Sequence, residues 1–288
     1  MGYLVLAVTI VTLICVSHAF HGLSLRSRCS SSAMGRPVSM SSASGPPSLF
    51  DTLADTIRNL GQQPQQSGKM KGGKTDLKIY DEEIESCTAV MRDAVKKEAP
   101  PSQVIENLMS LEKLMRKKNR LDDNATSRET LANLNGAWRL VFTTGTVDSQ
   151  KKIGKINYFP IKAVQCFNTE TQRISNGIYI GNYAVLKFFG QFEWVEKARK
   201  LEFDFDKIQL FSGALSFPLK SGEAAALGSS TGLGSEGNVE LAKKDKKAFF
   251  NWISADGDIA TARGGGGGLA LWRKDVEMQA IEDIFVTP

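Results

Sequence analysis

The apolar positions of residues 76–134 follow a helical period. From residue 76 to 97 they recur at alternating spacings of three and four, which predicts a helix with one buried face. Two consecutive prolines interrupt the chain, and the same spacing resumes from Ser102, which predicts a second helix. Thr126 and Glu129 have the spacing of a capping box, so we expect one further helical turn that ends at Leu134.

After Gly136 the apolar period changes from that of a helix to that of a strand. Leu201, Phe203 and Phe205 alternate with charged residues, as do the positions around Trp138, which is typical of half-buried strands. Shorter apolar runs predict further strands at 153–158, 164–167, 174–180, 183–189, 192–196, 215–217, 248–253, 259–262 and 269–272. Many short strands with no helices between them indicate an antiparallel sandwich or barrel, preceded by two to three α-helices.

Two glycine-rich segments and the C-terminal tail complete this part of the chain. Residues 221–238 are rich in Gly, Ser and Ala, which predicts a mobile loop. The five glycines of 264–268 are not followed by Lys-Ser/Thr and do not open a helix, which excludes a phosphate-binding loop. They lie between two predicted strands, so we interpret them as a hairpin turn. Residues 276–288 are acidic and partly apolar, and we expect a final helical turn there.

The first 74 residues differ from the rest in composition. Residues 3–16 are continuously apolar but too short to span a membrane. The small residues Ser17 and Ala19 stand at the two positions that a signal peptidase reads, which predicts a signal peptide over 1–19 with Phe20 as the new N-terminus. Residues 20–45 are rich in Ser, contain Arg and lack acids, which is transit-peptide composition. This arrangement resembles the bipartite plastid presequence of algae with secondary plastids. Plain secretion, with a disordered linker after the signal peptide, is the alternative.

Residues 46–74 contain a short amphipathic segment, 48–61, and a Gln/Gly/Lys-rich stretch without an apolar period. We expect a small helix on a flexible linker that docks on a partner or on the protein's own barrel.

The distribution of charge and of reactive residues excludes several function classes. The formal charge is +5, but residues 1–50 contain three arginines and no acid, so the remaining chain is nearly neutral. Both histidines, His18 and His21, lie in the same segment. Without them the chain has no Ser-His-Asp or Cys-His catalysis and no histidine metal site, and we expect no cofactor.

Two further features have ordinary structural explanations. Cys87 falls on the buried face of the first helix, where we expect a structural thiol. The basic residues between Lys113 and Arg120 end the second helix, where they complement its dipole. No aromatic residues alternate with this basic cluster, which argues against nucleic-acid binding.

A small antiparallel barrel either fills its interior with side chains or holds one apolar ligand, and the pattern does not decide between these. The candidate residues of the interior or rim are Trp138, Leu140, Phe142, Phe192, Trp194, Phe203, Phe205 and Arg263. Arg263, beside the glycine turn, would contact a polar head group or pair with a surface acid.

Three stretches carry a family resemblance. Residues 133–144, NLNGAWRLVFTT, resemble the "LNGxWxLxYTT" opening of the plastid lipid-associated protein (fibrillin) domain. Val164-Gln165 and Ile174-Ser175-Asn176 are similar to its central strands, and residues 256–271 resemble its closing hairpin. The resemblance implies a lipocalin-like (calycin-type) barrel and a role with plastid lipids, as a coat of plastoglobules, at thylakoids, or in binding isoprenoid and quinone-like molecules.

Together these observations predict a series of segments and two functional hypotheses. The segments are a signal peptide (1–19), a transit peptide (20–45), a short helix and linker (46–74), a helical leader (75–133), a barrel (134–275) and a tail (276–288). The first hypothesis is a non-enzymatic plastid protein that binds a hydrophobic lipid or isoprenoid in its barrel or associates with a plastoglobule or thylakoid surface. The second is a scaffold with a filled barrel that docks on a thylakoid or biosynthetic complex through residues 48–61.

Overall fold

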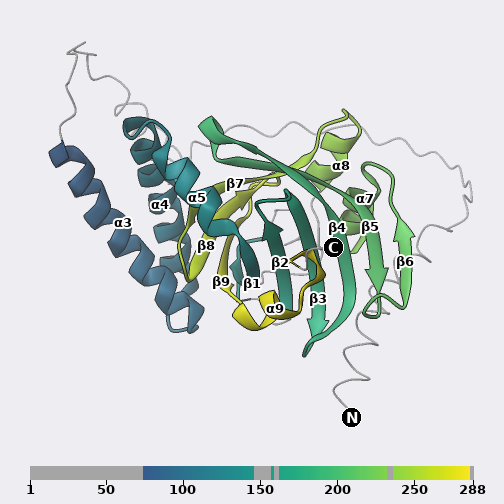
Figure 1. Cartoon of the computed structure of the whole chain (residues 1–288). Helices are drawn as coiled ribbons and strands as arrows, with labels where there is room; N and C mark the ends of the chain where they lie inside the picture. The colour runs from purple at the N-terminus through teal and green to yellow at the C-terminus, as the bar shows by residue number, and fades with distance from the viewer. Residues whose placement is uncertain (1–73, 146–156, 159–161, 232–235, 286–288) are drawn as a thin grey trace, which may run out of the picture. The chain divides into compact units, whose positions relative to one another are not determined.

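The computed structural model describes residues 74–145, 157–158, 162–231 and 236–285 (Figure 1). The predicted signal peptide, transit peptide and tethered helix lie outside the described residues, as do residues 153–156 of one predicted strand.

Three helices precede the sheet: α3 (Lys74–Val95), α4 (Pro101–Leu121) and α5 (Ala125–Leu134). Figure 1 shows α3 and α4 side by side next to the barrel. Their apolar stripes are buried together with Phe142, Ile253 and Leu271 on the outer face of the strands. Cys87 is buried in this cluster, as its position on the apolar stripe predicts.

The beginning of α5 differs from the expected capping box. Asn124, not Thr126, is the residue before the helix, and its φ of 62° lies in the left-handed region. The carboxylate of Asp122 accepts hydrogen bonds from the backbone N–H of Thr126, at 3.0 Å, and from its hydroxyl. The capping-box prediction is wrong because a tight turn at residues 122–124 lets the helix begin earlier, with an upstream carboxylate to satisfy its N–H groups.

In the described ranges nine antiparallel strands follow: β1 (Gly136–Thr143), β2 (Lys162–Asn168), β3 (Arg173–Ile180), β4 (Tyr183–Val195), β5 (Lys200–Leu210), β6 (Leu215–Pro218), β7 (Ala248–Ala255), β8 (Ile259–Gly264) and β9 (Leu269–Lys274). Their order is β4-β3-β2-β1-β9-β8-β7-β5-β6, and β4 also pairs with β5. That pairing closes eight strands into a barrel, with β6 added to the far half of β5. The predicted antiparallel barrel, preceded by helices, is confirmed.

The strand β4 is longer than expected. The pattern predicts two runs, separated near Gly190, whereas the structure has one strand of 13 residues with an irregular register between Phe189 and Gly190. A Cβ atom at Gly190 would lie 1.9 Å from the backbone oxygen of Asp204 on β5. Glycine therefore permits the close approach and the bend that carry β4 around the barrel.

Residues 221–238 are not the expected loop. They contain all of the short helix α7 (Glu223–Thr231) and the beginning of α8 (Glu236–Ala242). Figure 1 shows α7 beside β5, and both helices contact the sheet, α7 at β5 and α8 at β7. The prediction weighted Gly and Ser too heavily, because consecutive alanines favour a helix once the segment packs on a surface.

The C-terminal tail forms the expected helical turn, α9 (Val276–Ile281), followed by a 3₁₀ turn, η2 (Asp283–Phe285). This segment packs on the outer face of β1, β2, β3 and β4, where Met278 and Ile284 are buried. Beneath it, the Tyr179 hydroxyl donates to Glu282 at 2.6 Å, and Lys187 lies 2.9 Å from the other carboxylate oxygen. All three side chains are buried.

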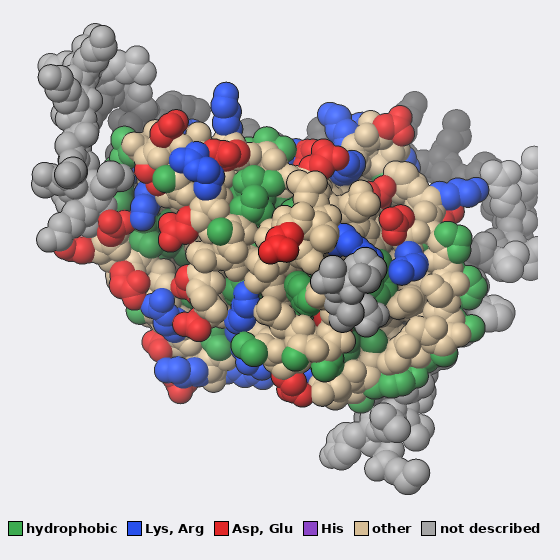
Figure 2. All heavy atoms as spheres, viewed as in Figure 1, with side chains coloured by type: hydrophobic (Ala, Val, Ile, Leu, Met, Phe, Trp, Pro, Cys, Tyr) green, Lys and Arg blue, Asp and Glu red, His purple; other side chains and the backbone are tan. Residues whose placement is uncertain are grey.

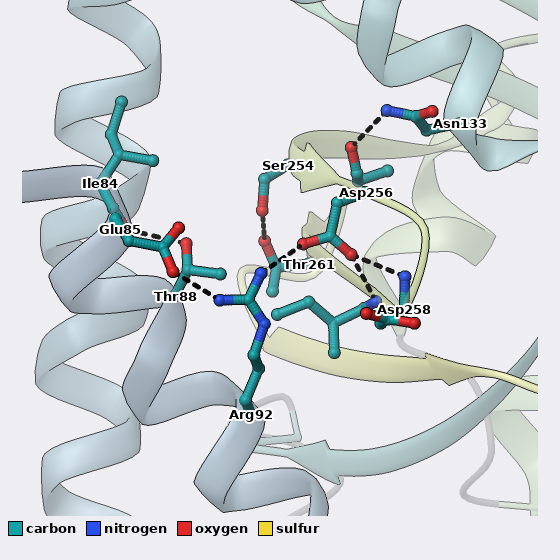
Figure 3. Close-up of polar contacts among 11 residues, drawn as sticks. Ile84, Glu85, Thr88, Arg92, Asn133, Ser254, Asp256, Asp258 and Thr261 are labelled. Atoms are coloured by element: carbon teal, nitrogen blue, oxygen red, sulfur yellow. Dashed lines mark hydrogen bonds and ion pairs between the residues drawn. The ribbon is translucent and has the colours of Figure 1, made fainter. Parts of the chain in front are cut away.

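A polar cluster connects α3 to the turn between β7 and β8 (Figure 3). Arg92 reaches Glu85 on its own helix at 2.7 Å and Asp256 at 3.4 Å. Asp256 also accepts the backbone N–H groups of Asp258 and Ile259, each at 2.8 Å. The aspartate that shapes the turn thus also positions the helix.

Candidate functional site

One half of the barrel interior is filled. Phe167, Trp252 and Phe192 occupy it, with ring centroids of Phe167 5.4 Å from Trp252 and 6.1 Å from Phe192. Trp138 is fully buried beside them, and its indole N–H donates to the backbone oxygen of Leu134 at 2.7 Å. Because Leu134 ends α5, this hydrogen bond fixes the helix across the filled end.

The other half contains a cavity of about 340 Å³. The strand residues that line it are Leu140, Thr143, Ala163, Gln165, Asn176, Ile178, Leu186, Phe188, Phe203, Asp204, Phe205, Ala248, Phe249, Phe250, Gly264, Ala270 and Trp272. This volume lies in the range of sites for small organic ligands. The interior of this eight-stranded barrel is therefore partly filled and partly hollow.

The cavity is open because β5 changes partner. Its first residues, Lys200 to Phe203, pair with β7, whereas Lys207 to Leu210 pair with β6. Between these two stretches β7 no longer covers the edge of β5. Residues of α7 and α8, including Ala224 and Ala242, line the cavity there together with Lys246. The two helices thus take the place of a missing piece of barrel wall.

Aromatic rings form one wall of the cavity. Phe203 and Phe250 are stacked with centroids 5.1 Å apart, and Phe205 lies 5.3 Å from Phe203. Phe188 extends the row beyond Phe205, and Trp272 extends it beyond Phe250. Such rings offer large apolar faces to an occupant.

Strands β2 and β3 contribute polar groups to the lining. Gln165 and Asn176 face each other across the two strands. Gln165 is 8% exposed, and its side-chain oxygen has no hydrogen-bond partner among the described residues. A buried amide oxygen without a donor is costly, so this oxygen is suited to accept a hydrogen bond from an occupant.

The five glycines form the predicted hairpin turn, and the turn lies at the rim of the cavity. Gly267, with a φ of 86°, adopts the left-handed conformation that such a turn requires. A Cβ atom on Gly265 would come within 3.2 Å of the Phe249 ring. The lack of side chains therefore leaves room at the entrance.

Arg263 pairs with an acid, which is one of its two predicted roles. Its Nε lies 3.1 Å from both carboxylate oxygens of Glu112, and its Nη2 lies 2.6 Å from Oε2. Its Nη1 donates to the backbone oxygen of Gly267 at 2.7 Å. Hydrogen bonding from Arg263 lowers the pKa of Glu112 below its ordinary value. The pair joins α4 to the glycine turn and does not line the cavity.

The predicted interior residues separate into three groups. Leu140, Phe203 and Phe205 line the cavity, whereas Trp138, Phe192 and Trp194 belong to the filled half. Phe142 lies outside the barrel, against Tyr158 and the helices, which corrects its expected inward position. The register of β1 with β9 shifts between Leu140 and Phe142, and such a bulge reverses the alternation of faces.

Sequence reasoning missed several cavity residues. Phe188, Phe250 and Trp272 lie in predicted strands, but only the closed barrel shows which of their faces turns inward. In the sequence, Gln165 stands out only as part of a stretch that resembles the family's central strands. The residues on both sides of Gln165 in β2 are apolar, so no alternation of apolar and polar positions marks its side chain as inward-facing.

A comparison with protein families identifies the chain's relatives. The model of the PAP_fibrillin family matches residues 92–271, from the end of α3 to β9. The chain belongs to the PAP_fibrillin family. The three resembling stretches all fall within this match, and the resemblance to plastid lipid-associated proteins is confirmed. No curated protein and no solved structure gives a significant match.

Membership of the PAP_fibrillin family associates this protein with plastid lipids and implies a plastid location. Proteins of this family are generally lipid-associated rather than enzymatic. Within the described part of the chain, no helix is long and apolar enough to cross a membrane. No cluster of three or more His, Cys, Asp or Glu among these same residues has the geometry to hold a metal ion.

Proposed function

We propose that this PAP_fibrillin protein binds one hydrophobic small molecule of lipid, isoprenoid or quinone type in the open half of its barrel. The observation that carries the proposal is the cavity of about 340 Å³ between an aromatic wall and the partnerless oxygen of Gln165. Its role is non-enzymatic: it holds the molecule and shields it from water.

The lining defines the chemistry of the occupant. Phe203, Phe205 and Phe250 contact a flat ring or a chain of methylated carbons. The Gln165 side-chain oxygen accepts a hydrogen bond from one donor group, such as a hydroxyl. The occupant is therefore largely apolar, with a single polar group directed toward β2.

We further propose that the protein acts in the plastid, at a thylakoid or plastoglobule surface, and is imported by a signal peptide and a transit peptide. The exposed apolar residues Phe211, Leu215 and Phe217 support surface association, because all three lie on the β5–β6 hairpin. Figure 2 shows hydrophobic side chains at the edge of the molecule where β6 lies. Single exposed apolar residues are ordinary, but a group on one hairpin is typical of a contact surface.

The test is native mass spectrometry, with organic extraction, of protein purified from plastids. We expect a co-purifying apolar molecule, and we expect Ala270→Trp to abolish its retention by filling the cavity. Ala226→Trp is the matched control, since Ala226 is exposed on α7 and does not line the cavity. An empty barrel in the wild-type protein, or equal retention in both variants, would contradict the proposal.

The scaffold hypothesis makes a different prediction in the same preparation. If residues 48–61 dock on a complex, their deletion releases the protein from thylakoid membranes, whereas Ala270→Trp has no effect on its location. Residues 48–61 lie outside the described part of the chain, so this hypothesis rests on their sequence pattern.

A further inference from the structure

A polar cleft lies on the outside of the barrel, between the second half of α4, the 3₁₀ turn η1 (Glu196–Ala198) and β7. Its volume is about 300 Å³. Four of its lining residues are cationic, namely Arg116, Arg120, Lys197 and Arg199, and Glu112 is the single carboxylate among the described residues that line it. The two α4 arginines are four residues apart and therefore share one face of the helix.

Arg199 forms the base of this cleft. It follows η1 with a φ of 48°, and it is 5% exposed. Its Nη1 donates to the backbone oxygen of Ile253 at 2.7 Å. No carboxylate in the described ranges lies within ion-pair distance of its guanidinium, although a buried charge in a protein is normally paired.

Each of the two nearby carboxylates accepts hydrogen bonds from residues other than Arg199. Glu112 accepts from Arg263 at 2.6 and 3.1 Å and from Arg116 at 3.2 Å. Asp122 accepts the N–H and hydroxyl of Thr126 through Oδ2, and its Oδ1 is buried with no hydrogen-bond partner among the described residues. The cleft therefore has more positive than negative charge.

The pKa of Arg199 agrees with this excess of positive charge in the cleft. Burial is the main cause that lowers the pKa of Arg199 to about 10; the positive charge of Arg116 acts in the same direction, and Glu112 and Asp122 act in the opposite one. Pairing with a carboxylate raises the pKa of an arginine instead, because an opposite charge favours the charged form.

We propose that this cleft binds a phosphate group, with the Arg199 guanidinium at its base and Arg120 and Lys197 at its rim. A planar guanidinium donates two parallel hydrogen bonds to phosphate oxygens, and several cations around one cleft suit an anion with more than one charge. The group comes from the head group of an anionic lipid or from a soluble phosphate ester. The site lies outside the barrel and does not depend on the cavity ligand.

The rim residues allow a test that leaves the fold intact, since Arg120 and Lys197 are exposed and form no ion pair among the described residues. The variant Arg120→Gln/Lys197→Gln is compared with Lys113→Gln/Lys220→Gln, which removes the same charge from exposed positions outside the cleft. Calorimetric titration with inorganic phosphate and pyrophosphate measures affinity. Flotation with phosphatidylcholine vesicles, with and without phosphatidic acid, measures head-group binding.

We expect the rim variant to weaken phosphate binding about tenfold, the loss of roughly one charge-assisted hydrogen bond, and the control to change it little. Loss of vesicle binding in the rim variant alone assigns the site to a lipid head group, and loss of phosphate binding without any vesicle binding assigns it to a soluble ester. Arg199→Lys, which retains the charge but not the fork of donors, should weaken binding while the melting temperature falls only slightly. Absence of binding to both probes, or equal binding by the rim and control variants, would overturn the proposal.

Discussion

The guanidinium of Arg263 on β8 holds both carboxylate oxygens of Glu112 on α4, with its Nη2 2.6 Å from Oε2. The same arginine donates to Gly267 in the turn at the cavity rim. Two residues 151 positions apart thus connect the helical layer to the entrance of the barrel.

Glu112→Gln should lower the free energy of unfolding by about 1.5–3 kcal/mol at neutral pH, because it removes a charged hydrogen-bond acceptor from a half-buried pair. Urea denaturation measures the change. Glu106→Gln is the control, because Glu106 is exposed on the same helix.

The contribution of this pair should also depend on pH. Since Arg263 lowers the pKa of Glu112 in the folded state, the stabilisation is complete above the pKa of an unfolded glutamate, about 4.3, and is lost as pH falls through the lower folded value. The stability difference between wild type and Glu112→Gln should therefore shrink in acid. A difference that stays constant down to the acid transition would count against this role of the pair.

Gly190→Ala should destabilise the barrel strongly, by about 3 kcal/mol or more, since its Cβ atom would lie 1.9 Å from the backbone oxygen of Asp204. Gly257→Ala is the matched control, because a Cβ atom at Gly257 meets nothing within 4 Å. Circular dichroism recorded during heating measures the melting temperatures of the two variants, and we expect that of Gly190→Ala to be much lower. Equal melting temperatures would mean that β4 and β5 separate without loss of stability.

Glu282→Gln should cost about 3–5 kcal/mol, because it leaves the buried Lys187 without its carboxylate while the Tyr179 hydroxyl keeps an acceptor. Lys187→Met/Glu282→Gln should recover much of the loss, since both charges are then removed. Chemical denaturation of the two variants tests this. Glu277→Gln, at an exposed position of α9, is expected to change stability little.

Cys166 should not react with thiol reagents in the folded protein. Burial raises the pKa of its thiol far above the ordinary value, and the side chain is fully buried. Peptide-resolved mass spectrometry after iodoacetamide treatment should show Cys166 and Cys87 unmodified in buffer and modified in urea. Rapid labelling of Cys166 in buffer would show that the segment from α9 to η2 opens readily.

The helices of the leader and most strands could be predicted from the sequence because a buried face imposes its period on the chain. The predictions that failed have identifiable structural causes. The bulge in β1 placed Phe142 outside, and Gly190 made one bent strand of two runs. The α7 and α8 helices arise from packing against the barrel, which no local pattern of Gly, Ser and Ala reports.

The candidate site was only partly predictable, because packing between distant parts of the chain is not visible in the local sequence pattern. Leu140, Phe203 and Phe205 were found because alternation predicts which face is apolar. Arg199 was not found, since nothing in the sequence marks the residue after a 3₁₀ turn as a buried cation.

By itself, the sequence determined the helical leader, the antiparallel barrel and the membership of a plastid lipid-associated family, because period, composition and motifs are properties of local sequence. Only the tertiary structure decided that the barrel is filled at one end and hollow at the other, and which aromatic rings line the cavity. Those properties depend on where β5 changes its partner from β7 to β6, and strand pairing is a contact between residues far apart in the chain.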